Sequence, residues 1–157
     1  MPDTTSPGDQ LAVNKTVITT LIDQVLNAGR LDLIEQLCAP EVADEVRAWI
    51  ASFRTSFPDV RMETIDLIAE GDQVVGRFTC SATHLAPWLG HPPTGRRFDN
   101  VDEINIYRLR GGRIIDTWTL EDNVARITQL ELVISQSSWR HPLGARPATV
   151  RRPAGDR

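Results

Sequence analysis

Residues 90–122 read GHPPTGRRFDNVDEINIYRLRGGRIIDTWTLED and hold two long segments in which apolar and polar residues alternate. Gly111 and Gly112 separate the two segments. A Gly-Gly pair in this position is typical of a tight antiparallel hairpin, because both central turn residues need a positive φ. The second segment runs through Trp118 to Asp122, which we therefore expect at the far end of the hairpin. A carboxylate just past an apolar strand end is well placed to lose its water and to act as a base near neutral pH.

Outside this hairpin, the spacing of apolar residues changes once along the chain. Before residue 58 they recur at helical spacing, and from residue 60 they alternate as in a strand. We expect helices at 11–28, 31–38, 41–57 and 123–134, and strands at 60–69, 73–84, 98–109 and 113–121. Helices that precede an antiparallel sheet indicate the α+β class, in which the helices cover one face of the sheet.

Length and composition indicate one globular domain. The chain has 157 residues, of which 41% are hydrophobic and 24% charged, as in ordinary globular proteins. We expect a disordered N-terminus at 1–9, the domain at 10–135, and an Arg- and Pro-rich tail at 136–157. The tail arginines could bind an acidic partner, but such ends are more often solvated and poorly ordered.

The same composition argues against several classes of partner. A net charge of -4 disfavours a general nucleic-acid binder. No apolar run approaches the length that crosses a bilayer, and the first six residues lack the basic and hydrophobic regions of an export signal. Cys38 and Cys80 have no metal-like spacing and are interpreted as small core residues in a reducing compartment. We therefore expect a cytoplasmic protein with no metal site.

An ordered set of short motifs resembles the SnoaL-like polyketide cyclase and ester cyclase group of the NTF2-like superfamily. The resemblance covers roughly residues 12 to 132, and one extra residue near Asp99-Asn100 fits a β-bulge. The motifs are Phe57-Pro58-Asp59, Glu70-Gly71-Asp72-Gln73-Val74, His84, Gly90-His91-Pro92-Pro93-Thr94-Gly95-Arg96, Glu103-Ile104-Asn105-Ile106-Tyr107-Arg108, Gly112-Arg113-Ile114-Ile115-Asp116, Trp118 and Asp122. The resemblance implies a cone in which N-terminal helices pack on a strongly curved antiparallel sheet, with a small-molecule site in the hollow.

The resemblance also implies that Asp122 is the general acid/base. Simple alternation along the strand places Asp122 on one face with Ile114, Trp118 and Leu120, while Glu121 points away. Asp122 is equally suited to cap a helix that begins near Asn123, and the two roles can coexist. His84 is a second catalytic candidate that could share a proton with the substrate or hydrogen-bond an enolate, or could simply be a hydrogen-bonded loop residue.

Three polar residues, Glu103, Asn105 and Tyr107, alternate on one face of the third expected strand. They line a pocket or else form the solvent face of an ordinary amphipathic strand. Relatives often carry histidine where Asn105 stands, and asparagine can donate to an oxyanion but cannot titrate. We therefore take Asn105 as a catalytic candidate, and Glu103 and Tyr107 as substrate-binding candidates.

Aromatic residues and one arginine complete the set of substrate-binding candidates. Trp118, Trp88 and Phe57 would suit a flat aromatic or polyketide substrate, although core packing also explains buried aromatic residues. Arg77 interrupts an apolar run, and either pairs with an acid such as Asp66 or Glu63 or holds a substrate oxygen. We rate the ion pair higher.

The chain has none of the usual cofactor or nucleophile motifs, so we expect chemistry by proton transfer alone, without a cofactor. The favoured hypothesis is a polyketide-tailoring enzyme that closes a ring by intramolecular aldol addition. The alternatives are a cofactor-free hydroxylase of an anthracycline-type ring and a non-catalytic binding module, because one scaffold hosts many functions. Strands with apolar residues on both faces, such as Val74-Val75 and Ile114-Ile115, further predict a homodimer.

Overall fold

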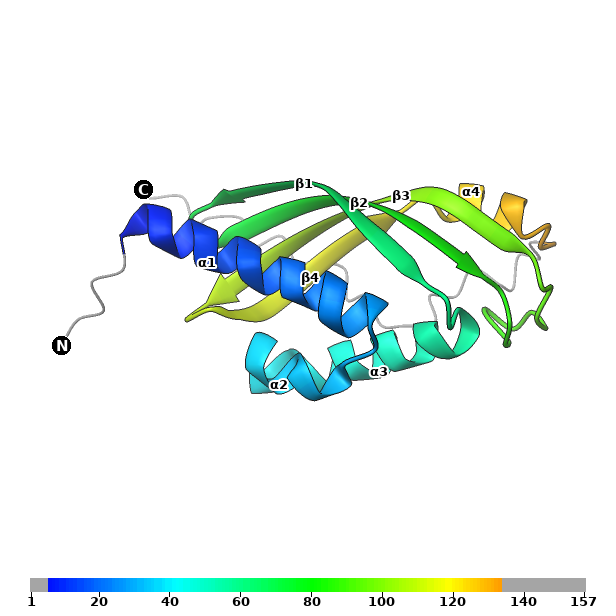
Figure 1. The fold of residues 1–157 in the computed structure, drawn as a ribbon, viewed down its shortest axis with the longest axis horizontal. Coiled ribbons are helices and arrows are strands. Elements are labelled where there is room, and N and C mark those ends of the chain that lie inside the picture. Colours follow the sequence, from blue (N-terminus) through cyan, green and yellow to red (C-terminus); the bar gives the residue numbers. More distant parts are fainter. Residues whose placement is uncertain (1–5, 134–157) are drawn as a thin grey trace, which may run out of the picture.

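A computed structural model describes residues 6–133, and the expected tail at 136–157 lies outside these residues. Helices come first and a four-stranded antiparallel sheet follows, which confirms the α+β class (Figure 1). The elements are α1 (Pro7–Thr20), a π-type helical segment η1 (Leu21–Asn27), a 3-10 turn η2 (Leu31–Leu33), α2 (Ile34–Leu37), α3 (Pro40–Ser56), β1 (Arg61–Glu70), β2 (Gln73–Thr83), β3 (Arg97–Arg110), β4 (Arg113–Glu121) and α4 (Asn123–Gln129). Among these residues no helix is both long enough and apolar enough to cross a membrane.

The four strands follow one another in space in chain order, β1-β2-β3-β4. Gly111 and Gly112 form the β3–β4 turn with φ values of 58° and 73°, so the predicted Gly-Gly hairpin is confirmed. Gly71, with φ 57°, begins the corresponding turn between β1 and β2. The register from β1 to β4 is therefore set by two tight turns and by the loop that joins β2 to β3.

The first helix begins earlier than the sequence analysis expects. Pro7 is its first residue, whereas residues 1–9 were expected to be disordered and the helix to begin at Leu11. Ser6 caps it, because its hydroxyl accepts a hydrogen bond from the Asp9 N–H at 3.2 Å. Serine followed by proline at the first helical position is a recognised start signal, so this boundary was readable from the sequence.

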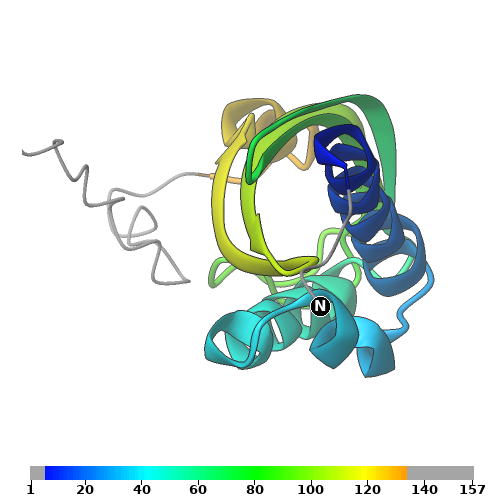
Figure 2. The same cartoon turned by 90° about the vertical axis from the view of Figure 1, so that its left-hand side faces the viewer.

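The sheet is strongly curved, and helices close its open side (Figure 2). Figure 2 shows α1 along one margin of the arc and α2 and α3 along the other. The α2–α3 junction is fastened to edge strand β4, where the Ala39 N–H donates to the Ile114 carbonyl at 2.8 Å. Asn27 joins the end of η1 to β1 by exchanging two hydrogen bonds with the Met62 backbone. These contacts hold the helices over the inner, concave face of the sheet.

Three β-bulges interrupt the sheet; one is in β1 at Ile65, and the other two decide which side chains of β3 and β4 point inward. At the first of these two, Ser81 of β2 lies opposite both Asp99 and Asn100 of β3, and Asn100 has a φ of 51°; the predicted bulge is confirmed. The second is in β4, where Leu109 pairs with Ile114 and Arg108 with Asp116, which leaves Ile115 as the extra residue. An extra residue reverses the alternation beyond it, because opposite residues of a pair share a face.

Candidate active site

The inner face of β3 carries a row of buried polar side chains. Glu103, Asn105 and Tyr107 are 3%, 6% and 3% exposed, so they do not form the solvent face of the strand. The Asn105 Nδ2 donates to the Tyr107 hydroxyl at 3.1 Å, and its Oδ1 has no hydrogen-bond partner among residues 6–133. On β4, Thr117 and Thr119 lie opposite Tyr107 and Asn105 and are exposed, so the inner face is open to solvent beside this row.

Arg126 of α4 is fully buried at one end of this row. Its Nη2 donates to Glu103 Oε1 at 2.6 Å, and its Nη1 donates to Glu121 Oε2 at 2.6 Å and to Asn123 Oδ1 at 2.7 Å. The remaining donor, Nε, is buried and unpaired among the described residues. We call Glu103, Glu121 and Arg126 the buried charge cluster.

Burial changes the pKa values of Glu103 and Arg126 in the buried charge cluster. Loss of water raises the pKa of Glu103 to about 7, an effect that the Arg126 guanidinium opposes and the Glu121 carboxylate reinforces. Because a pKa near the working pH suits proton transfer, Glu103 is able to hold or release a proton at neutral pH. Loss of water lowers the pKa of Arg126, the nearby Glu103 and Glu121 carboxylates raise it, and the pKa is raised overall.

An aromatic wall packs against the charge cluster. The Arg126 guanidinium carbon lies 5.0 Å from the Phe98 ring centre, 5.6 Å from that of Phe53 and 5.8 Å from that of Trp88. Phe57, at the end of α3, packs edge-on against both Trp88 and Phe98. The wall therefore joins α3, the β2–β3 loop and β3 around one guanidinium.

His84, just beyond β2, packs against the Phe57 and Trp88 rings of this wall. It is fully buried, with its ring centre 5.5 Å from that of Phe57 and 6.4 Å from that of Trp88. The Thr94 N–H donates to Nδ1 at 3.3 Å, which places the ring proton on Nε2. Nε2 has no partner among residues 6–133, and burial lowers the pKa of the ring. His84 is thus a neutral donor with a free N–H.

Two open pockets on the described part of the molecule are considered as possible small-molecule sites. The first, of about 330 Å³, lies between α1 and α2 and is lined by Ala12, Val13, Thr16, Val17, Thr20 and Leu37. The second, of about 250 Å³, is formed by the paired ends of β3 and β4, at 102–104 and 120–122. No three His, Cys, Asp or Glu side chains within residues 6–133 are grouped to hold a metal ion.

Comparison with known proteins identifies the family. Residues 16–130 match the model of the SnoaL-like polyketide cyclase family. The chain belongs to this family. It is 27% identical over 125 residues to aklanonic acid methyl ester cyclase DnrD of Streptomyces peucetius, covering 79% of this chain and 80% of that one.

Solved structures agree with this assignment. TsrD of Streptomyces laurentii is 26% identical, with a TM-score of 0.72 over 78% of this chain and 97% of TsrD. IdmH of Streptomyces antibioticus, described as a candidate polyketide cyclase, is 29% identical, with a TM-score of 0.65 over 76% of this chain and 99% of IdmH. The SnoaL-like cone predicted from the sequence is confirmed.

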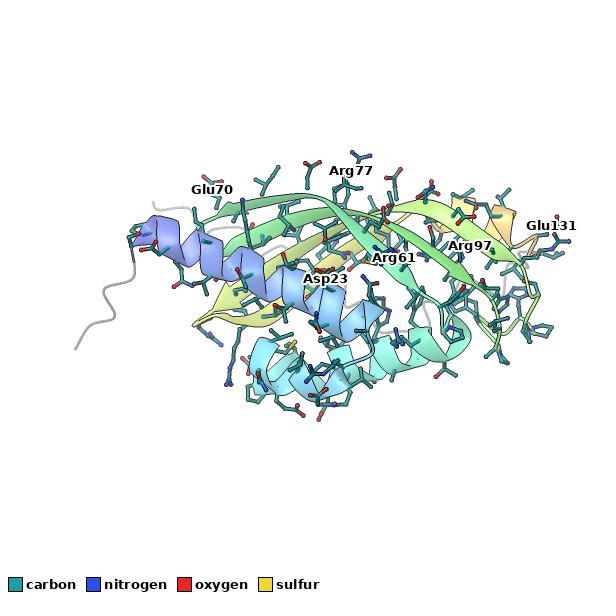
Figure 3. All side chains as sticks on the ribbon, viewed as in Figure 1. Asp23, Arg61, Glu70, Arg77, Arg97 and Glu131 are labelled. Carbon is teal, nitrogen blue, oxygen red and sulfur yellow. The ribbon has the colours of Figure 1, made fainter. Side chains whose placement is uncertain are left out.

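Three of the predicted site residues take no part in the buried charge cluster, although Asp122 follows Glu121 and lines the second pocket with it. Asp122 is exposed and caps α4, its Oδ1 accepting the Ala125 N–H at 2.9 Å. Trp118 is 45% exposed on the convex face. Arg77 also projects from the convex face (Figure 3), where it pairs with Asp102 at 3.5 Å rather than with Asp66 or Glu63.

The predicted facing of β4 is wrong beyond residue 115. Because of the bulge at Ile115, Trp118 lies opposite Ile106 on the convex face, and Glu121 lies opposite Glu103 on the concave face. Glu121 therefore turns toward Arg126 instead of away from the site, and Trp118 and Leu120 turn outward. The remaining candidates form two groups. Glu103, Asn105 and Tyr107 lie buried on the inner face of β3, and Phe57, His84 and Trp88 pack on one another.

Sequence analysis missed Arg126. Val124, Ile127 and Leu130 recur at helical spacing in the last helix, as in a buried stripe, but Val124 is 62% exposed and Arg126 is buried instead. Arg126 shares helical spacing with Ile127 and Leu130, so a charge on an apolar stripe was the available signal. A charge at such a position marks a buried pair or a functional site.

Proposed function

We propose that this SnoaL-like protein is a cofactor-independent polyketide cyclase that closes a ring by intramolecular aldol addition. The main observation behind the proposal is three buried polar atoms without a partner among residues 6–133: His84 Nε2 and Arg126 Nε, whose side chains pack on the aromatic wall, and Asn105 Oδ1 on the inner face of β3. Buried polar atoms are normally hydrogen-bonded, so the two N–H donors suit oxygen atoms of a ligand, and the Asn105 Oδ1 acceptor suits a ligand hydroxyl. A polyketide has such oxygens along its carbon chain.

The reaction needs one base and donors for the developing oxyanion. A carboxylate removes a proton from a carbon flanked by two carbonyl groups, the enolate carbon bonds to a second carbonyl carbon, and the new alkoxide takes up a proton. His84 donates its free Nε2–H to the enolate oxygen, and the Asn105 amide hydrogen-bonds a neighbouring substrate oxygen or hydroxyl. Phe57 and Trp88 hold a flat substrate so that the reacting carbons stay close.

The family resemblance implies that Asp122 is the base, and this role stays a prediction. One Asp122 oxygen caps α4, and the side chain is exposed at the end of β4. Asp122→Asn keeps size and much of the capping while removing the base, so it isolates the chemical role. If Asp122 is the base, turnover falls by roughly two or more orders of magnitude while substrate binding survives.

The test of the function is conversion of a substrate of the aklanonic acid methyl ester type by the purified protein. Aldol closure yields a product with the same mass as the substrate, and it proceeds whether or not dioxygen is present. His84→Leu removes the oxyanion donor and is expected to lower turnover by about 10²-fold, whereas His91→Gln, in the same loop, serves as the matched control. A product that gains an oxygen atom would indicate the hydroxylase alternative, and binding without conversion would indicate the binding module.

We also infer that two copies associate through the convex face of the sheet. Four apolar residues lie opposite one another across all four strands: Ile68, Val75, Ile106 and Trp118. Ile68 is 67% and Trp118 is 45% exposed, and the adjoining row adds Ile104 and Leu120, which are 40% and 57% exposed. A contiguous apolar band of this kind favours a two-fold interface between identical sheets.

A further inference from the structure

The Asn105 side chain holds a buried hydrogen-bond acceptor that has no donor. Asn105 is 6% exposed, and its Nδ2 donates to the Tyr107 hydroxyl at 3.1 Å. Its Oδ1 has no hydrogen-bond partner among residues 6–133. A buried amide oxygen without a donor costs free energy, which a bound donor recovers. A ligand group that binds to this oxygen must therefore carry an O–H or N–H.

Thr119 of the edge strand β4 lies directly opposite Asn105. Opposite residues of an antiparallel pair share a face, so Thr119 points to the concave side. Glu121, two residues further along β4, agrees with this orientation because it contacts the buried Arg126. The nearest side chain across the ladder from the Asn105 amide is thus a threonine, whose hydroxyl both donates and accepts.

The spacing of the Asn105–Thr119 pair suits one shared ligand atom. The Asp122 N–H donates to the Asp102 carbonyl at 3.0 Å, so these two opposite residues form a hydrogen-bonded pair. Pair types alternate along an antiparallel ladder, which makes Asn105–Thr119 a non-hydrogen-bonded pair with closer side chains. Their Cβ atoms are then about 5 Å apart, and two hydrogen bonds to one oxygen span a similar distance.

The concave face beside Asn105 is closed on the β2 side and open on the β4 side. Gly76 of β2 lies opposite Asn105, and the buried Phe78 ring covers it, since a Cβ at Gly76 would lie 2.2 Å from that ring. On β4, Thr117 and Thr119 are both exposed. A ligand therefore has an approach to Asn105 across the inner face of β4.

The chemistry of this pair favours a neutral hydroxyl group. A hydroxyl donates to Asn105 Oδ1 and accepts from the Thr119 hydroxyl, whereas a carbonyl or ether oxygen only accepts and leaves Oδ1 unpaired. The neighbouring Glu103 and Glu121 carboxylates share one guanidinium, so an anionic oxygen is disfavoured here. Phenolic and enolic hydroxyls of polyketides have the required properties.

We propose that Asn105 and Thr119 form a subsite that recognises a neutral hydroxyl group on the ring system of a flat polyketide, with Thr119 as a specificity-determining residue. This proposal rests on the proposed function, because it takes the concave interior as the place where the polyketide binds. The subsite binds and orients the ring, and it leaves the proton transfer to Asp122. A substrate with a keto or ether oxygen at this position is selected against.

The first experiment measures binding rather than turnover. Three flat probes are compared by quenching of tryptophan fluorescence, below the pKa of the ligand hydroxyl: 2-hydroxyanthraquinone, 2-methoxyanthraquinone and unsubstituted anthraquinone. Wild type is expected to bind the hydroxy probe about 10-fold or more tightly than the other two, because they leave Asn105 Oδ1 without a donor. Absence of binding of the hydroxy probe, or equal binding of all three, would overturn the proposal.

Variants then assign the preference to the two residues. Thr119→Val keeps the shape but lacks the hydroxyl, and is expected to weaken binding of the hydroxy probe by about 5- to 10-fold, leaving the other probes unchanged. Thr119→Ser should restore the affinity. Asn105→Leu should abolish the preference, and adding Thr119→Val to it should have little further effect, because both residues bind one hydroxyl. The matched control is Thr117→Val, on the same exposed face of β4.

The ring-closure assay separates this proposal from the proposed function. Thr119→Val is expected to raise KM by about 5- to 10-fold for a hydroxylated substrate with little change in kcat, as for a group that binds ground state and transition state alike. A Thr117→Val effect as large as that of Thr119→Val, or an unchanged affinity in Thr119→Val, would overturn the subsite. Selective binding by a protein that closes no ring would instead refute the proposed function and leave the subsite in place.

Discussion

At the scale of single residues, burial changes what each acid in this protein can do. Asp122 and Glu103 are both carboxylates near the β3–β4 ladder, but one caps a helix in water and the other faces a guanidinium in the interior. Removing one partner of a buried charge pair is far more costly than removing an exposed one. The interior acid is therefore the one whose protonation is coupled to folding.

This coupling predicts an unusual dependence of stability on pH. The pKa of Glu103 rises from 4.5 to about 7 on folding, so the folded state keeps a proton that the unfolded state has released. The contribution of Glu103 to stability is fully present below pH 4.5 and is lost as the pH rises toward 7. The loss is on the order of 3 kcal/mol.

Urea unfolding at several pH values checks this prediction. The difference in the free energy of unfolding between wild type and Glu103→Gln should shrink as the pH rises from 4.5 to 8, because glutamine does not titrate. Glu63→Gln, which removes an exposed carboxylate on β1, is the matched control. A wild-type advantage that grows with pH would mean that Glu103 is ionised in the folded protein.

At the scale of elements, the sequence predicted β3 correctly and β4 only in part. No bulge interrupts β3 between Val101 and Arg108, so simple alternation identified its buried polar row. In β4 the extra residue Ile115 changes the face of the sheet to which every later side chain points. Two consecutive isoleucines are the local sign of this bulge in the sequence. The partner of a buried polar residue is set by tertiary contacts, which explains why Arg126 was not anticipated.

Gly76 in β2 tests how closely an element is packed around the site. It lies opposite Asn105, and a Cβ added there would come within 2.2 Å of the buried Phe78 ring. Because Phe78 cannot move into solvent, Gly76→Ala is expected to lower the free energy of unfolding by about 2 kcal/mol or more. Gly8→Ala, whose nearest neighbour is the Ser6 hydroxyl at 3.9 Å, should leave stability unchanged or slightly raised.

Thermal and urea unfolding of Gly76→Ala and Gly8→Ala measure these two changes in the free energy of unfolding. The Gly76 variant should also weaken substrate binding. The Phe78 ring that it displaces lies over Gly76, beside the inward-facing Asn105 and Glu103 of β3. An unfolding midpoint equal to that of wild type would mean that the ring has another place in the interior. It would also remove the argument that Gly76 shapes the site.

At the scale of the whole molecule, the two faces of the curved sheet carry different kinds of side chain. Its concave face carries the polar row and the charge cluster, and its convex face carries the apolar row from Ile68 to Trp118. The bulge at Ile115 contributes to both, because it turns Glu121 inward and Trp118 outward in the same strand. One local irregularity thus completes the site and the proposed interface together.

The proposed interface predicts a dimer that a single charge can separate. Leu120 is 57% exposed beside Trp118 and Ile104, so Leu120→Glu places a charge inside the apolar band. Like charges would then meet across the two-fold axis, and burying them without partners is costly. Light scattering at micromolar concentration should give the mass of two chains for wild type and of one chain for Leu120→Glu. Val124→Glu, an equally exposed apolar position on α4, should remain dimeric because it lies outside the band. A monomeric wild type, or a Leu120→Glu protein that stays dimeric, would contradict the convex face as the interface.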